Sequence, residues 1–234
     1  MPPAVVWTGF SYFKRFFLKS SVMEHFPKHT IMACFYLACK VEEFNVTATE
    51  FVRNLKSGTP DGNTEIILTL EPVIMEKLDY QLTVHSPFRA LEGHLIQLKA
   101  HLPGNPDPEA YRLDCRDFLE TALHTDVCLL FPPSQIALAA VQRAARLQTH
   151  DLTSYLTSVL CANDAATAEK LLAKLQRVED AVYGLQGLST EQQAQLQTRA
   201  KNCMEAMARL EEEKKRQEKR EGKDGQSNGD DDDD

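Results

Sequence analysis

The side chains best suited to chemistry in this 234-residue chain are the charged ones that end an apolar run. Residues 31–39 contain no charge, and Lys40, Glu42 and Glu43 follow within the next four residues. Such a cluster can form ion pairs and charge-assisted hydrogen bonds with a partner protein. A buried helix must also end in soluble residues, so the cluster by itself leaves a docking surface and a plain helix end both open.

No other group of residues in the sequence predicts catalysis or metal binding. The six cysteines are scattered without a C-x-x-C pair, and most lie in apolar patterns, where a free cysteine behaves as a small hydrophobe. We find no nucleophile–base–orienter set, metal cluster or phosphate-binding loop. We therefore predict no catalytic residue, no metal and no cofactor.

The charge of the chain argues against broad nucleic-acid binding. Of the net charge of −8, a large part comes from residues 211–234, which hold eleven acidic and six basic side chains. Charge-driven nucleic-acid binding needs a Lys/Arg face, which the nearly neutral body lacks. No apolar run is long enough to cross a membrane, which takes about 20 residues. We expect neither direct nucleic-acid binding nor membrane insertion.

The elements that position the charge cluster are helices. A helix through residues 31–39 is apolar on every side, which is typical of a buried helix. No segment alternates as a strand does, so the predicted fold class is all-α. The other expected helices cover residues 4–18, 49–55, 63 or 64 to 78, 86–99, 109–130, 132–147, 152–160 and 165–185. Pro72 lies inside the third of these, where we expect a kink or a break.

An internal repeat predicts two similar halves. At an offset of 105 residues, residues 12–40 match residues 117–145. The most specific match places Phe26-Pro27 on Phe131-Pro132 and Ile31 on Ile136. Two unrelated helix starts remain the alternative.

The repeat suggests a division of the chain. We predict a first repeat over residues 1–84, a second over 85–187, a charged C-terminal helix over 188–221 and a disordered acidic tail over 222–234. The C-terminal helix has a coiled-coil-like seam that packs either on the second repeat or on a third subunit. The seam consists of Leu196, Ala200, Cys203, Met207 and Leu210.

Several runs of the sequence resemble the cyclin family. They are YFKRFFLKSSVMEHFP (residues 12–27), LACKVEEFNV (37–46), YQLTVHSPFR (80–89) and LLFPPSQIALAA (129–140). The resemblance extends to about residue 210 and is closest to the cyclins of the CDK-activating kinase. It implies the cyclin fold of two helical repeats.

The resemblance also implies a kinase-contacting site. The lysine with which cyclins contact their kinase falls on Lys40, and its partner glutamate falls on Glu71. The neighbouring contact positions fall on Val41, Glu43, Phe44, Tyr80 and Leu82.

The sequence departs from the cyclin pattern at three points. The first helix of the first repeat is absent, which implies that the central helix is partly uncovered. Trp7 stands where a small residue is expected, at a cost of about 1–3 kcal/mol if the position is tightly packed. Pro72 biases Glu71 away from helical geometry, which weakens the expected pairing of Glu71 with Lys40.

For function, the resemblance implies a nuclear, non-catalytic regulatory subunit that binds and activates a cyclin-dependent kinase. The expected partners are the kinase, an assembly-factor third subunit and the core of transcription factor IIH, which acts on the RNA polymerase II tail. The alternatives are a truncated isoform that is inactive or competes for the kinase, a cyclin-fold transcription factor that binds DNA, and a small helical enzyme.

Overall fold

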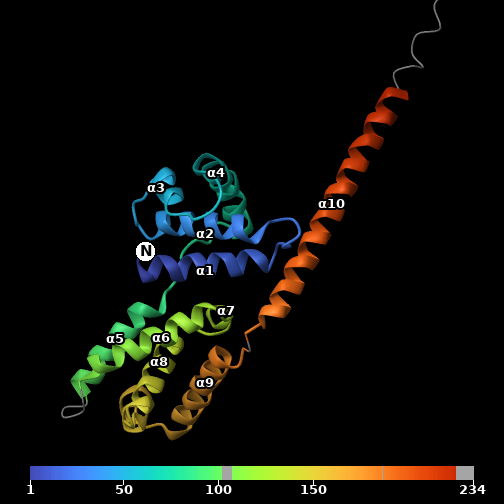
Figure 1. Ribbon diagram of the computed structural model, residues 1–234. Helices are drawn as coiled ribbons and strands as arrows, with labels where there is room; N and C mark the ends of the chain where they lie inside the picture. The colour runs from blue at the N-terminus through green and yellow to red at the C-terminus, as the bar shows by residue number, and fades with distance from the viewer. Residues whose placement is uncertain (102–106, 186, 225–234) are drawn as a thin grey trace, which may run out of the picture. The chain divides into compact units, whose positions relative to one another are not determined.

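The chain folds into helices joined by short connections, as the computed structural model in Figure 1 shows. The structure describes residues 1–101, 107–185 and 187–224, and these ranges contain no strand. The predicted all-α class is therefore confirmed. In chain order the helices are α1 (Pro3–Phe17), α2 (Pro27–Val41), α3 (Ala48–Arg53), α4 (Pro60–Lys77), α5 (Pro87–His101), the 3-10 helix η1 (Pro108–Tyr111), α6 (Arg112–Leu123), α7 (Val127–Leu130), α8 (Pro133–Leu147), the π-helix η2 (Tyr155–Leu160), α9 (Ala165–Tyr183) and α10 (Thr190–Asp224).

Helices α1 to α4 form a first group around one core, and α2 is its centre. It contacts α1 and α4, which lie on either side of it in Figure 1. Small side chains let these helices approach closely, and Ala33, Cys34, Ala38 and Cys39 have no exposed surface. The predicted burial of this segment is confirmed.

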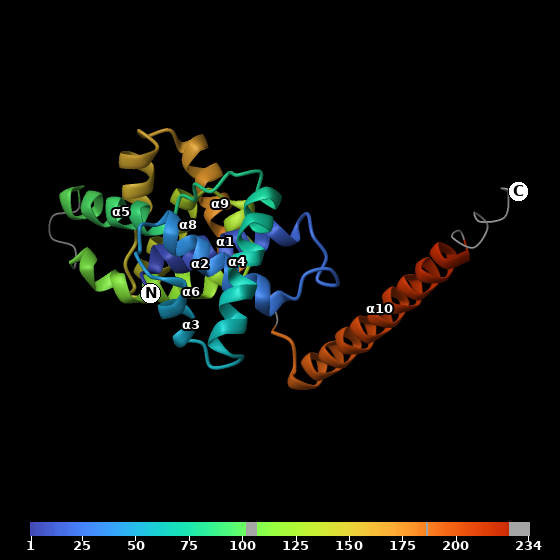
Figure 2. The same cartoon turned by 90° about the horizontal axis from the view of Figure 1, so that it is seen from above.

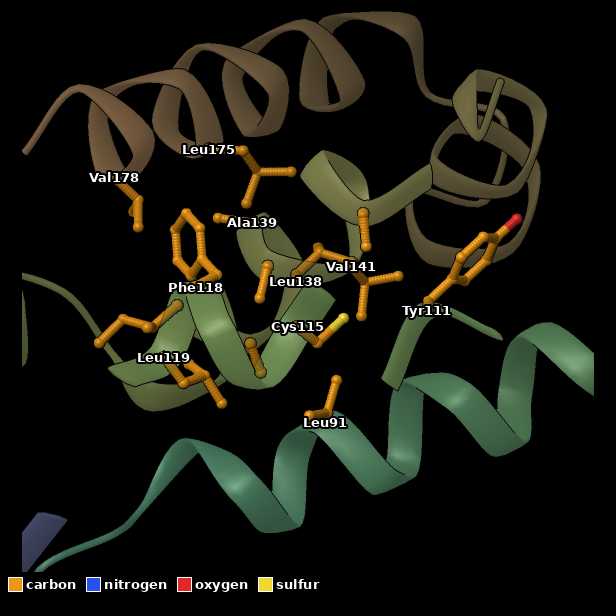
Figure 3. Close-up of a cluster of buried hydrophobic side chains, with 14 of the residues drawn as sticks. Leu91, Tyr111, Cys115, Phe118, Leu119, Leu138, Ala139, Val141, Leu175 and Val178 are labelled. Atoms are coloured by element: carbon orange, nitrogen blue, oxygen red, sulfur yellow. The ribbon is translucent and has the colours of Figure 1, made fainter. Parts of the chain in front are cut away.

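Helices α5 to α9 form a second group, and α8 is its centre. It contacts α5, α6 and α9. Figure 3 shows the core that forms around it. Leu138 and Val141 of α8 lie in one cluster with Leu91 of α5, Phe118 of α6 and Leu175 of α9. Each group of helices thus has its own central helix and its own core.

The two central helices are equivalent in length and in how they begin. Each has 15 residues and a proline in its first position. That proline is Pro27 in α2 and Pro133 in α8, whereas Pro132 precedes α8 as its N-cap residue. The helix starts are therefore one residue further apart than the sequence offset of 105 indicated.

Helix α8 ends in a strained residue. The amide of Thr149 donates to the Arg146 carbonyl at 3.0 Å and that of His150 donates to the Ala145 carbonyl at 2.8 Å. These bonds form a Schellman motif, in which Thr149 takes the left-handed position that glycine usually occupies. Thr149 has φ 61°, which is unfavourable for a β-branched side chain.

We expect Thr149→Gly to stabilise the fold by about 0.5–1 kcal/mol, because relief of the left-handed strain outweighs the larger entropy that glycine loses on folding. The Thr149 side chain is exposed, so little packing is lost. Urea unfolding followed by circular dichroism measures the change. Thr149→Ala keeps the Cβ and should gain clearly less. An equal gain for alanine would mean that the strain is not the cause.

Two predicted helix boundaries are wrong. The helix expected over residues 109–130 is interrupted after α6, where the Thr125 hydroxyl donates to the Ala122 carbonyl at 2.9 Å and accepts from the Val127 amide. Helix α4 begins at Pro60 rather than near residue 63, because the Thr59 hydroxyl caps it by accepting from an amide.

Of the kink or break predicted at Pro72, the break does not occur, since α4 continues through it. Proline crowds the carbonyl four residues earlier and cannot donate to it, and that carbonyl belongs to Leu68. Both Pro72 and Leu68 are exposed, so this carbonyl is on the side of the helix that water can reach. The helix loses one hydrogen bond on its solvent face and keeps the others.

Helix α1 joins the two groups of helices. It contacts α2 and α4 of the first group and α7 of the second, and in the view from above the first group lies over the second (Figure 2). Trp7 of α1 is 2% exposed and belongs to the core of the second group. Its ring meets that of Phe88 edge to face, with centroids 6.2 Å apart. The bulky side chain expected to be overpacked therefore has a place between the two cores.

A lysine of α1 makes a second link. Lys14 Nζ donates to the Leu123 carbonyl at 2.7 Å and to the Thr125 carbonyl, and it lies 3.7 Å from Cys128 Sγ. These carbonyls lie at and just beyond the end of α6, where the helix dipole favours a cation. Residues 1–186 accordingly form one compact unit.

Residues 187–234 form a separate unit, which contains α10. The helix runs to Asp224, three residues into the segment predicted as a tail, and residues 225–234 of that segment lie outside the described residues. The predicted seam along α10 has exposed side chains, among them Leu196 and Leu210. What packs on this seam remains a prediction.

Candidate functional site

An ion pair joins α2 to α4. Lys40 Nζ, in the last turn of α2, donates to both carboxylate oxygens of Glu71 at 2.7 and 2.8 Å. The Glu71 side chain is 12% exposed, whereas that of Lys40 is 46% exposed. A carboxylate buried to this extent needs a cationic partner. Glu71 thus holds the ammonium at the surface, and two of its three N–H groups are used.

Pro72 does not prevent this pairing. Glu71 lies within the continuous helix α4 in spite of the proline that follows it. The bias of a residue before proline toward extended geometry is a preference, and here the ion pair and the surrounding helix outweigh it.

An aromatic ring also positions Lys40. The ammonium lies 4.6 Å from the centre of the Tyr36 ring, within the range of a cation–π contact. Tyr36 was not among the residues predicted from the sequence. Its position four residues before Lys40 on the same helix is the signal that could have revealed the contact.

The end of α2 exposes Phe44, four residues after Lys40. Glu43 has φ 56°, its amide donates to the Lys40 carbonyl at 3.2 Å, and the Phe44 amide donates to the Cys39 carbonyl at 2.8 Å. This is again a Schellman motif, with Glu43 in the left-handed position. Glu43 and Phe44 are both exposed as a result.

The end of α4 has the same construction and exposes Tyr80. Asp79 has φ 53°, its amide donates to the Glu76 carbonyl at 2.9 Å, and the Tyr80 amide donates to the Met75 carbonyl at 2.9 Å. Tyr80 is 69% exposed. Both helices that contribute to the ion pair therefore end by presenting an aromatic ring to solvent.

The remaining predicted contact residues are less exposed. Val41 and Leu82 are half-buried and pack against the core of the first group. The Leu82 carbonyl accepts a hydrogen bond from the hydroxyl of Tyr12, which anchors the segment after α4 to α1. Burial raises the pKa of the Tyr12 hydroxyl well above its ordinary value, so it remains a donor at neutral pH.

One member of the charged cluster points inward. The Thr8 hydroxyl donates to Glu42 Oε1 at 2.6 Å. Thr8 is fully buried on α1. Of the three charged residues that follow the apolar run, only Lys40 and Glu43 are therefore presented outward.

An apolar groove of about 630 Å³ lies beside this surface. Ile31 and Phe35 of α2 are half-buried along it, and the exposed Phe44 also lines it. The central helix is thus partly uncovered on one side, as predicted. The groove is lined by Met1, Ile31, Met32, Phe35, Phe44, Val46, Phe51, Asn54 and Leu55.

The equivalent end of α8 is arranged differently. His150 follows the left-handed Thr149 as Phe44 follows Glu43, but its Nδ1 lies 3.0 Å from the Tyr111 hydroxyl. The residue that would face a partner is therefore held by the second group itself. Only the first group presents an aromatic residue at the end of its central helix.

The buried thiols are poor nucleophiles, since burial raises the pKa of Cys34, Cys39 and Cys115, the last to about 12. Within the described ranges no three His, Cys, Asp or Glu side chains are grouped so that they could hold a metal ion. None of the helices described here is both long and apolar enough to cross a membrane.

Two helical repeats, each built around a central 15-residue helix, define the class of cyclin-fold proteins. Sequence comparison agrees with this assignment. The cyclin N-terminal domain matches residues 1–83, and the cyclin C-terminal domain matches residues 86–208. The chain belongs to the cyclin family, as its sequence predicted.

Similar proteins include cyclins of the H type. The chain is 40% identical to Cyclin-H of Xenopus laevis over 207 residues, covering 87% of this chain and 64% of the relative. It is 31% identical to Cyclin-H1-1 of Arabidopsis thaliana over 222 residues, covering 92% and 65%. The chain therefore spans about two thirds of the length of these relatives.

Two solved structures are similar in fold. A chain of the yeast TFIIK (Kin28/Ccl1/Tfb3) complex aligns with a TM-score of 0.60 and 27% identity, covering 78% of this chain and 77% of the other. A chain of the CAK complex of Chaetomium thermophilum bound to ATP-γ-S aligns with a TM-score of 0.73 and 24% identity, covering 100% and 75%. The second likeness concerns the fold alone.

Proposed function

We propose that this chain is a non-catalytic regulatory subunit that binds and activates a cyclin-dependent kinase. The observation that carries the proposal is the ion pair of Lys40 with the largely buried Glu71, together with the exposed rings of Phe44 and Tyr80 that follow the ends of α2 and α4, the two helices that hold the pair. Aromatic residues around a positioned charge are the composition expected at the centre of a protein interface.

The proposed contacts follow from this geometry. The N–H of Lys40 that Glu71 does not use donates to a backbone carbonyl of the kinase. Phe44 and Tyr80 pack on an apolar patch beside it, with Val41, Glu43 and Leu82 at the edges. By resemblance to other cyclins, docking moves a kinase helix inward, which completes the Lys–Glu pair of the kinase active site and repositions its activation loop.

The proposed setting is the CDK-activating kinase and transcription factor IIH, with action in the nucleus on cell-cycle kinases and the RNA polymerase II tail. Support comes from relatives named as H-type cyclins and from the likeness to a chain of a TFIIK complex that contains Kin28, Ccl1 and Tfb3. An assembly-factor third subunit is accordingly part of the proposal.

We expect Lys40→Ala to weaken kinase binding by about thirtyfold, which corresponds to the roughly 2 kcal/mol of an interface hot spot. The experiment is co-expression with a kinase of the CDK-activating type, followed by affinity capture and a kinase assay. Lys28→Ala is the matched control, because Lys28 is exposed at the opposite end of the same helix. Control binding should equal that of the unchanged chain.

Because Lys40→Ala leaves Glu71 without its cation, a second variant separates binding from folding. Tyr80→Ala changes an exposed ring, so it should weaken capture while the melting temperature stays constant. Capture unaffected by both changes would contradict the proposed surface. Capture without kinase activation would instead support the alternative of an inactive competitor.

A further inference from the structure

Two dipeptides in the chain have the Ser/Thr-Pro form that proline-directed protein kinases modify: Thr59-Pro60 and Ser86-Pro87. Such a kinase requires the hydroxyl-bearing residue and the proline together, in an extended and accessible segment. The structure distinguishes the two dipeptides by this requirement.

Thr59-Pro60 meets the requirement. Every residue from Lys56 to Asp61 is exposed, and residues 54–59 lie between helices α3 and α4. Thr59 has φ −95° and ψ 148°, so its backbone is already extended. Its hydroxyl oxygen accepts one hydrogen bond from the Gly62 amide at 3.2 Å, an interaction weak enough to be replaced when a kinase binds.

Ser86-Pro87 does not meet it. Each proline is the first residue of a helix, but Ser86 is half-buried and Pro87 is buried, whereas Thr59 and Pro60 are both exposed. Presenting this dipeptide to another protein would require the start of α5 to leave the fold. Thr59 is therefore the accessible acceptor of the two.

We propose that Thr59 is a phosphorylation site for a proline-directed Ser/Thr protein kinase that uses ATP. The Thr59 oxygen attacks the γ-phosphorus of ATP and forms the new P–O bond. The bond from that phosphorus to the bridging oxygen of ADP breaks, ADP leaves, and the hydroxyl proton passes to the base of the modifying kinase.

The position of Thr59 also explains why the fold tolerates the product. Thr59 is the N-cap of α4, an 18-residue helix. The N-terminal end of a helix favours a nearby anion through its dipole and its unpaired amides. The site lies at the end of α4 away from Tyr80, so the phosphate does not enter the surface around Lys40 and Glu71. This inference does not depend on the proposed function.

The test is incubation of the folded full chain with ATP and a purified proline-directed kinase, with site assignment by mass spectrometry. We expect phosphate on Thr59, at least a tenfold loss of rate in Pro60→Ala, complete loss at this position in Thr59→Ala, and no change in Ser86→Ala. Circular dichroism establishes that each variant is folded.

A comparison with the urea-unfolded chain, diluted into the assay, addresses accessibility. We expect the folded chain to be modified at Thr59 at a rate within threefold of the freshly diluted one. Modification at Ser86 in place of Thr59, or a Thr59 rate that is more than tenfold lower in the folded chain, would overturn the proposal.

Discussion

Replacing Trp7 with alanine is expected to lower the free energy of unfolding of residues 1–186 by about 3–5 kcal/mol. Trp7 is 2% exposed, it projects from α1 into the core of the second group of helices, and its ring packs against Phe88. Removing it leaves a cavity where the two groups meet. Since typical domains are stable by only about 5–15 kcal/mol, this single change removes a large share of the total.

Urea unfolding of the full chain, followed by far-UV circular dichroism, measures this effect. Trp7→Phe keeps an aromatic ring in the cavity and should cost clearly less. Leu18→Ala, at the exposed end of the same chain segment, serves as the control and should change stability by less than about 0.5 kcal/mol. A loss below about 1 kcal/mol for Trp7→Ala would show that the ring does not join the two cores.

The single tryptophan of the chain is also a probe of this contact. Its fluorescence should shift to longer wavelength together with the loss of helical signal if the two repeats unfold as one unit. Two separate transitions would mean that the repeats are independently stable and that α1 detaches from the second repeat first.

Replacing Lys14 with alanine is expected to cost about 2–3 kcal/mol. Its ammonium donates to the Leu123 and Thr125 carbonyls. Hydrogen bonds to a charged group contribute about 1.5–3 kcal/mol, and carbonyls left without a donor add a desolvation cost. Lys14→Met keeps most of the aliphatic stem and should lose nearly as much, because the hydrogen bonds matter more than the packing.

Lys19 provides the matched control on the same stretch of chain. It pairs with Asp79, but both side chains are more than half exposed. Exposed ion pairs contribute about 0–1 kcal/mol, so Lys19→Ala should leave the urea midpoint nearly unchanged. Equal losses at Lys14 and Lys19 would rule out the carbonyl contacts of Lys14 as the cause.

Features of the fold could be predicted from the sequence where they depend on residues that are neighbours in the chain. The apolar run at residues 31–39 predicted a buried helix because nine uncharged residues in succession are apolar on every helical face. The prolines at positions 27 and 133 indicated helix starts, since a proline in the first position of a helix loses no hydrogen bond. Thr125, by contrast, ends α6 through its own side chain, and a threonine has no strong preference for that role in sequence.

The residues with left-handed backbone geometry could not be predicted from the sequence either. Glycine or asparagine marks such a position, but Glu43, Asp79 and Thr149 occupy it here. The hydrogen bonds of the two Schellman motifs at the ends of α2 and α4 hold Glu43 and Asp79 in that geometry. Their consequence, the exposure of Phe44 and Tyr80, became visible only in the folded chain.

The sequence by itself determined that this protein is all-helical, that its halves are similar and that it belongs to the cyclin family. Those properties follow from helical periodicity, prolines and short motifs, all of which depend on residues close together in the chain. It also indicated Lys40 and Glu71 as a pair, through resemblance.

Only the tertiary structure decided which core each side chain enters. Trp7 and Lys14 lie in a helix whose sequence matches the first repeat, yet both make their contacts with the second. The direction of Glu42 toward Thr8 was decided in the same way. The physical reason is that periodicity defines the faces of a helix, whereas the neighbours of each face depend on how helices far apart in the chain pack together.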